Sequence, residues 1–264
     1  MIDPARTREI IREGNVSIDL IAEGQGPLIV MLPSRGRGSE DFDEVAAGIA
    51  RAGFRVLRPQ PRGAGRSTGP LDGIRLQDLA GDVAAVLARE DAGPAIIAGH
   101  AFGSWVARMV ATDHPHLVRC IVLMAAASRA YPVGLRGVVE AAGDLALPDD
   151  ERLQALRRAF FAPGSDPSSW LDGWAPDAIR AQAVAVAATP QATYWPARDV
   201  PLLDLVAEHD PFKPRERWYE TAEDFGARAT VKLIAGASHA LLSEQPQAVV
   251  DAIVEWTQGQ THTR

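Results

Sequence analysis

Apolar residues along the chain form short runs that alternate with stretches of helical spacing. The runs 28–32 and 94–99 are almost continuously apolar, which is typical of strands covered on both faces. Residues 41–52 and 74–90 repeat apolar side chains at the three- to four-residue spacing of amphipathic helices. The other predicted strands are 16–23, 54–59, 119–126, 201–208 and 230–236, and the other helices of this pattern are 101–113, 214–225 and 245–258. Such alternation predicts an α/β fold with a mostly parallel sheet flanked by helices.

The alternation stops between residues 128 and 198. This segment has no strand-like run, and it contains helical stretches at 149–161 and 176–188 that proline and glycine residues separate. It also holds five of the chain's Trp and Tyr residues, namely Tyr131, Trp170, Trp174, Tyr194 and Trp195. We therefore expect one α/β core made of residues 1–127 and 199–264, with residues 128–198 inserted into it as a mainly helical unit.

Composition narrows the possible functions. Among 264 residues, 27 Lys and Arg face 34 Asp and Glu, which gives a net charge of −7. An acidic chain is a poor nucleic-acid binder, because phosphates are neutralised by basic surfaces. A single cysteine excludes an intrachain disulfide framework, a CxxC redox pair and a cysteine-cluster zinc site. The apolar runs are too short to span a bilayer, and the charged segment 1–13 lacks the apolar core of a secretory signal. We expect a cytoplasmic protein that does not bind membranes.

One short motif carries most of the functional information. Residues 99–103 read Gly-His-Ala-Phe-Gly and lie between a predicted buried strand and a predicted helix. This is the frame of the nucleophile elbow, G-x-S-x-G, in which the central residue occupies a strained turn between strand and helix. The chain resembles the α/β-hydrolase superfamily here. The resemblance covers nearly the whole chain, because the segments RGAGRS (62–67), AEHD (207–210) and ASHALLSEQP (237–246) follow in that family's order.

The resemblance implies an α/β-hydrolase fold whose helical cap, residues 128–198, is inserted after strand 6. It also implies an enzyme that acts on a small-molecule substrate without a cofactor or metal. The triad acid then falls on Asp210, after the strand at 201–208, and the triad base on His239, after the last strand. Glu208 is the substitute acid. The nucleophile position falls on Ala101, whose methyl group cannot attack a carbonyl.

The oxyanion hole departs from the family as well. Many members have His-Gly after the third strand, whereas this chain has Pro-Ser-Arg-Gly-Arg-Gly at 33–38. We expect the backbone N–H groups of Arg35 (or Ser34) and of Phe102 to serve as the oxyanion donors. The Arg35 side chain either faces solvent or points into the pocket, where it would pair with an anionic group of the substrate.

Three interpretations of Ala101 compete. In the favoured one, alanine is the natural residue and the His239–Asp210 pair does base chemistry on an ester or carbonyl substrate. In the second, the chain is a serine ester hydrolase whose nucleophile has been replaced by alanine, and in the third it is a non-catalytic binder of small molecules. The aromatic residues Trp170, Trp174, Tyr194 and Trp195 are expected to line the pocket, which predicts an apolar or aromatic ligand. Substrate identity and oligomeric state are left open.

Overall fold

The computed structural model describes residues 6–135 and 137–260, whose central feature is an eight-stranded sheet. The strand order is β1-β2-β4-β3-β5-β6-β7-β8. Strand β2 is antiparallel to both of its neighbours, and all the other neighbouring pairs are parallel. The strands are β1 (Thr7–Glu13), β2 (Val16–Glu23), β3 (Leu28–Leu32), β4 (Arg55–Pro59), β5 (Ala95–His100), β6 (Val118–Met124), β7 (Leu202–Ala207) and β8 (Ala229–Ile234). The mostly parallel α/β sheet is the one predicted, with β1 as an additional strand.

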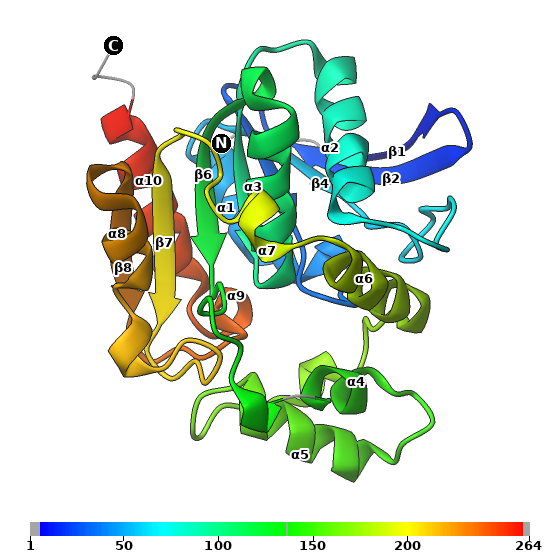
Figure 1. The fold of residues 1–264 in the computed structure, drawn as a ribbon, viewed down its shortest axis with the longest axis vertical. Coiled ribbons are helices and arrows are strands. Elements are labelled where there is room, and N and C mark those ends of the chain that lie inside the picture. The colour runs from blue at the N-terminus through cyan, green and yellow to red at the C-terminus, as the bar shows by residue number, and fades with distance from the viewer. Residues whose placement is uncertain (1–5, 136, 261–264) are drawn as a thin grey trace.

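Helices cover both faces of the sheet (Figure 1). Helices α2 (Leu76–Glu90) and α3 (Phe102–Asp113) pack on one face, and α1 (Asp43–Arg51) and α10 (Pro246–Gly259) pack on the other. Strand β3 shows how the sequence builds this arrangement: Val30 and Leu32 join the α2–α3 side, while Ile29 and Met31 join the α1–α10 side. A strand buried on both faces has to be apolar at every position, which accounts for its continuous apolar run.

The segment between β6 and β7 is helical. It contains α4 (Val138–Gly143), α5 (Asp149–Ala159), α6 (Pro176–Ala188) and α7 (Gln191–Tyr194). In Figure 1, α4 and α5 lie beyond the carboxyl ends of β6 and β7, whereas α6 and α7 lie beside the layer formed by α2 and α3. The remaining helices are α8 (Glu220–Phe225), α9 (Leu241–Glu244) and the 3-10 turns Ser39–Phe42, Pro115–Leu117, Val133–Leu135, Ser168–Trp170, Arg215–Arg217 and Gly226–Arg228. The carboxyl edge of the sheet, where open α/β folds bind ligands, is therefore covered by α4 and α5.

A buried arginine fastens part of this segment to the loop after β3. The Arg37 guanidinium lies 4.5 Å from the Trp170 ring centroid and 4.9 Å from that of Trp174. It also donates hydrogen bonds to the Asp41 carboxylate and to the backbone oxygen of Asp172. We call this arrangement the Arg37 clamp. Gly36 adds two hydrogen bonds, because its N–H donates to Gln182 Oε1 over 2.8 Å and its oxygen accepts from the Ala175 N–H over 2.9 Å.

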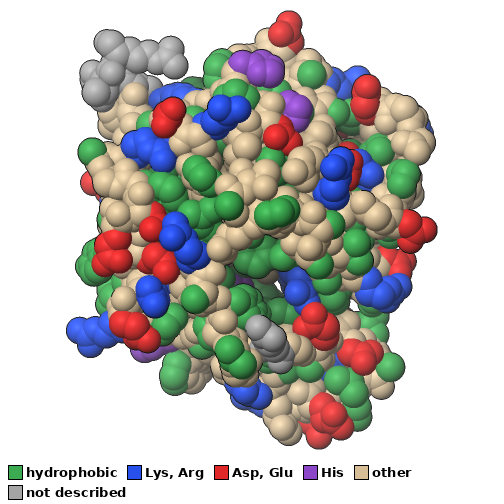
Figure 2. Space-filling view, viewed as in Figure 1, with side chains coloured by type: hydrophobic (Ala, Val, Ile, Leu, Met, Phe, Trp, Pro, Cys, Tyr) green, Lys and Arg blue, Asp and Glu red, His purple; other side chains and the backbone are tan. Residues whose placement is uncertain are grey.

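The surface carries both signs of charge. On the face shown in Figure 2, Lys and Arg side chains lie among Asp and Glu side chains. This face therefore lacks the continuous positive surface that phosphate backbones require. In the described part of the chain, no helix is both long and apolar enough to cross a membrane.

Candidate active site

The elbow is present as a strained turn between β5 and α3. Ala101 has φ 49° and ψ −111°, a conformation that costs a residue with a side chain about 1–3 kcal/mol. The flanking glycines are required by close packing. A Cβ at Gly99 would clash with the backbone of Gly103, and a Cβ at Gly103 would clash with the carbonyl group of Leu32. The backbone thus has the geometry of a nucleophile elbow, with a buried methyl group at its centre.

His239 and Asp210 meet beside the elbow. The Nδ1 atom of His239 lies 3.0 Å from Asp210 Oδ2, and both side chains are buried. Asp210 follows β7 and His239 follows β8, so two neighbouring strands bring them to one edge of the sheet. The other carboxylate oxygen, Asp210 Oδ1, accepts a hydrogen bond from the Phe212 N–H over 2.9 Å. A carboxylate facing Nδ1 places the ring proton there, which leaves Nε2 as the basic nitrogen.

The substitute acid is directed elsewhere. Glu208 is exposed, and its carboxylate accepts a hydrogen bond from the Gly236 N–H over 2.8 Å. Asp210 is therefore the carboxylate that orients His239.

A second histidine supports the loop that carries His239. His100 is completely buried, and its Nε2 lies 2.7 Å from the backbone oxygen of His239. Burial is the main reason why the pKa of His100 is lowered to about 3, and the proximity of His239 is the second. His100 is therefore neutral at physiological pH and donates from Nε2. Its Nδ1 has no hydrogen-bond partner among the described residues.

A small cavity of about 50 Å³ joins these parts. It is lined by the elbow residue, by His239 and by both segments predicted to supply oxyanion donors. Its walls are mainly aromatic and aliphatic. The lining residues are Ser34, Arg35, Ala101, Phe102, Trp105, Ala127, Tyr131, Val139, Phe212 and His239. Burial raises the pKa of Tyr131 to about 12, so its hydroxyl is protonated at neutral pH.

The predicted oxyanion donors lie at this cavity. Phe102 is the first residue of α3, so its N–H has no carbonyl partner within the helix and adds to the positive end of the helix dipole. Ser34 and Arg35 lie on the facing loop, which is closed by a hydrogen bond from the Arg37 N–H to the Ser34 oxygen over 3.1 Å. The arrangement can hold an oxygen that gains negative charge between the loop and the helix.

The four aromatic residues expected to line the pocket require a correction, because none of them is among the residues that line this cavity. Trp170 and Trp174 enclose Arg37 in the clamp. Trp195 covers buried Arg108, whose guanidinium lies 4.4 Å from its ring centroid, and Tyr194 packs in the same core. Buried arginines thus occupy the faces of three of these rings. The aromatic lining residues that the sequence did not single out as pocket residues are Trp105 on α3, Tyr131 after β6 and Phe212 after β7.

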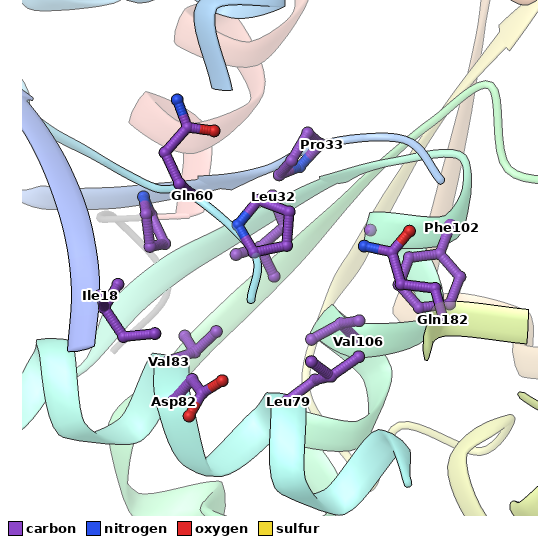
Figure 3. Close-up of a pocket in the computed structure, with 13 residues that line it drawn as sticks. Ile18, Leu32, Pro33, Gln60, Leu79, Asp82, Val83, Phe102, Val106 and Gln182 are labelled. Carbon is purple, nitrogen blue, oxygen red and sulfur yellow. The ribbon is translucent and has the colours of Figure 1, made fainter. Parts of the chain in front are cut away.

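A second small apolar cavity lies between α3, the helix that follows the elbow, and α2 (Figure 3). Phe102 and Val106 on α3 face Leu79 and Val83 on α2 across it. Its charged residue, Asp82, has a pKa raised by burial, and Arg62 holds it through hydrogen bonds of 2.7 and 2.8 Å. Since Asp82 is already paired and neither His239 nor Ala101 lines this space, we do not assign the chemistry to it.

Comparison with known proteins agrees with this combination of fold and site. The model of the Alpha/beta hydrolase family matches residues 29–252, and the chain belongs to this family. An esterase from Thermogutta terrifontis, solved with malate bound, superposes with a TM-score of 0.80 at 19% identity, over 97% of this chain and 99% of that one. At that identity the superposition shows the fold alone.

Two curated relatives are similar over part of their length. Pyrrolizixenacetamide deacetylase of Xenorhabdus hominickii is 26% identical over 158 residues, which cover 60% of this chain and 58% of the relative. The 2-(acetamidomethylene)succinate hydrolase of Mesorhizobium japonicum is 28% identical over 109 residues, which cover 41% and 39%. The matched regions therefore span about half the length of these relatives.

Proposed function

We propose that this chain is a hydrolytic enzyme in which the His239–Asp210 pair activates water against a small ester or amide, without a covalent intermediate at position 101. The observation that carries the proposal is the 3.0 Å contact between His239 and Asp210, at a cavity that Ala101 also lines. Hydrolase relatives, among them a deacetylase, support a hydrolytic reaction.

In this reaction His239 Nε2 accepts a proton from water, and the resulting hydroxide attacks the carbonyl carbon. The carbonyl oxygen becomes an oxyanion, which the N–H groups of Phe102 and Arg35 stabilise. The tetrahedral intermediate then collapses. The C–O or C–N bond to the leaving group breaks, and the imidazolium returns the proton to that group. Asp210 stabilises the imidazolium and holds its Nδ1–H.

The methyl group of Ala101 has a consistent place in this scheme. A serine there would present a hydroxyl to the histidine, whereas alanine leaves that space for the attacking water. A second candidate is a serine hydrolase whose nucleophile has been replaced by alanine. The strained backbone of Ala101 favours this candidate, because an alanine side chain gives no reason of its own for a strained turn.

The decisive experiment compares hydrolysis of a panel of small aryl esters and anilides by the wild-type chain and by His239→Ala. We expect kcat/KM to fall about 10²- to 10⁴-fold, the usual contribution of a general base. His209→Ala is the matched control, because His209 is an exposed histidine on the neighbouring loop.

A rate that His239→Ala leaves unchanged would contradict the proposal. So would a compound that both proteins bind equally well and neither hydrolyses, since that result identifies a binder. His209→Ala should behave like the wild-type chain.

A further inference from the structure

One charged side chain at the cavity is only partly satisfied. The Arg35 guanidinium pairs through Nη2 with Glu140 of α4, while its Nε is buried and has no hydrogen-bond partner among the described residues. Arg35 is 22% exposed and Glu140 is 53% exposed, so the arginine is the more enclosed member of the pair. A buried guanidinium N–H without an acceptor is unfavourable, so this guanidinium keeps unused donor capacity.

Arg35 is the arginine among the ten residues that line the cavity, and none of the ten is an aspartate or a glutamate. The other side chains are mainly apolar or aromatic, with Trp105 and Phe212 among them. The nearby Arg37 differs, because its guanidinium already donates to a carboxylate and to backbone oxygens. Arg35 is thus the charged group at this site with donor capacity left for a ligand.

We propose that the substrate of this site is a small carboxylate-bearing ester or amide whose carboxylate is bound by the Arg35 side chain. The proposal rests on the hydrolytic function proposed above. The apolar part of the substrate packs against Trp105 and Phe212, its carbonyl lies between Ala101 and His239, and its carboxylate is bound by the Arg35 guanidinium. A planar carboxylate matches the donor geometry of a guanidinium.

The same geometry gives Glu140 a role as competitor. Its carboxylate already occupies one edge of the Arg35 guanidinium, so an incoming carboxylate shares Arg35 with Glu140 or replaces it. Removing the charge of Glu140 should therefore strengthen the binding of an anionic ligand. A largely exposed ion pair contributes little, so we expect tighter binding by roughly two- to fivefold for Glu140→Gln.

The first test measures binding, which does not depend on turnover. Calorimetry compares phenylacetate with its uncharged isostere phenylacetamide, using wild type, Arg35→Gln, Glu140→Gln and the control Arg12→Gln. Arg12 is exposed on β1, and its substitution removes the same charge. Wild type and Arg12→Gln should bind the carboxylate at least about tenfold more tightly than the amide, as expected for a charge-assisted hydrogen bond. Arg35→Gln should lose that preference.

The second test measures turnover with two matched substrates, 4-nitrophenyl hydrogen succinate and its uncharged methyl ester. The ratio of their kcat/KM values should favour the charged substrate in wild type and fall about tenfold or more in Arg35→Gln. The ratio is the informative quantity, because it cancels any change in the oxyanion donors that the substitution causes in both reactions.

The outcomes separate the two proposals. His239-dependent hydrolysis with no preference for the charged substrate overturns the carboxylate site and leaves the hydrolytic function standing. Absence of His239-dependent hydrolysis overturns the hydrolytic function, and the calorimetry then decides the carboxylate site alone. Equal affinities of wild type for phenylacetate and phenylacetamide overturn that site, as does a preference that Arg35→Gln retains.

Discussion

The Nε2 atom of His100 lies 2.7 Å from the backbone oxygen of His239. This hydrogen bond joins the residue before the elbow centre to the residue that carries the proposed base. Because a carbonyl oxygen only accepts, Nε2 must carry the ring proton, and burial keeps the ring neutral by lowering its pKa to about 3. The elbow and the base loop are therefore connected by a group that does not change its charge near neutral pH.

This neutral histidine makes stability depend on pH. In the unfolded chain His100 takes up a proton as the pH falls through about 6.5, whereas in the folded protein it does so only near 3. The unfolded state thus binds the extra proton between these values, so stability is full above about 6.5 and declines below it. The expected slope is about 1.4 kcal/mol per pH unit for this proton.

Urea unfolding of wild type and His100→Asn between pH 7 and 4.5 measures the effect. In His100→Asn the free energy of unfolding should fall less steeply with decreasing pH than in wild type, whatever the stability of the variant at pH 7. His116→Asn, at an exposed position, is the control and should retain the wild-type slope. Parallel curves for wild type and His100→Asn would show that His100 is protonated in the folded protein as well.

Asp210→Asn tests how the base is oriented. The amide can donate to Nδ1, which favours the tautomer with the proton on Nε2 and removes the base. We expect kcat to fall about 10²- to 10⁴-fold with little change in KM. Glu208→Gln should keep nearly full activity, since Glu208 bonds to Gly236 and not to His239. A larger loss in Glu208→Gln than in Asp210→Asn would reverse this assignment.

Ala101→Ser tests the chemistry at the elbow. If water is the nucleophile, the serine hydroxyl takes the space of that water, so aryl-ester hydrolysis should rise by no more than about tenfold, equivalent to 1.4 kcal/mol of barrier. Unfolding stability should change little, because alanine already bears the backbone strain. Fluorophosphonate labelling and ester assays measure the change. Strong labelling with a large gain in rate would instead identify a serine hydrolase that has lost its nucleophile.

Arg37→Ala tests the clamp. The substitution removes the cation between Trp170 and Trp174 and leaves Asp41 without its partner. We expect a loss of about 3–5 kcal/mol in the free energy of unfolding, as when one member of a buried ion pair is removed. Limited proteolysis should then cut within residues 160–175. Arg75→Ala is the control, because Arg75 is exposed and forms a long i,i+3 pair.

Sequence pattern predicted the sheet well where strands are buried on both faces. Strands β3, β5 and β7 are buried at every position, and their nearly continuous apolar runs are easy to recognise in the sequence. Strand β1, of sequence TREIIRE, lies at the sheet edge, and its side chains are mostly exposed or partly exposed. Without burial there is no apolar pattern to detect. Helix α4 is short, and a helix of that length carries too few periodic positions.

The site was predictable only where chain order determined position. The residues that follow successive parallel strands meet at one edge, so the contact between Asp210 and His239 could be predicted from chain order. Which aromatic rings can line the pocket depends on which of them pack against the buried arginines Arg37 and Arg108. Nothing in the local sequence pairs Arg37 with Trp170 or Arg108 with Trp195, and so the aromatic lining was assigned to the wrong rings.

The clamp also makes the covering segment unequally held on its two sides. Arg37 and Gly36 bind the segment from Trp170 to Gln182, so the loop after β3 is fastened to that side of the covering segment. On the opposite side, the partly exposed Arg35–Glu140 pair joins this loop to α4. The covering segment is therefore held by a buried clamp on one side and by a partly exposed ion pair on the other, so we expect it to open first on the α4 side.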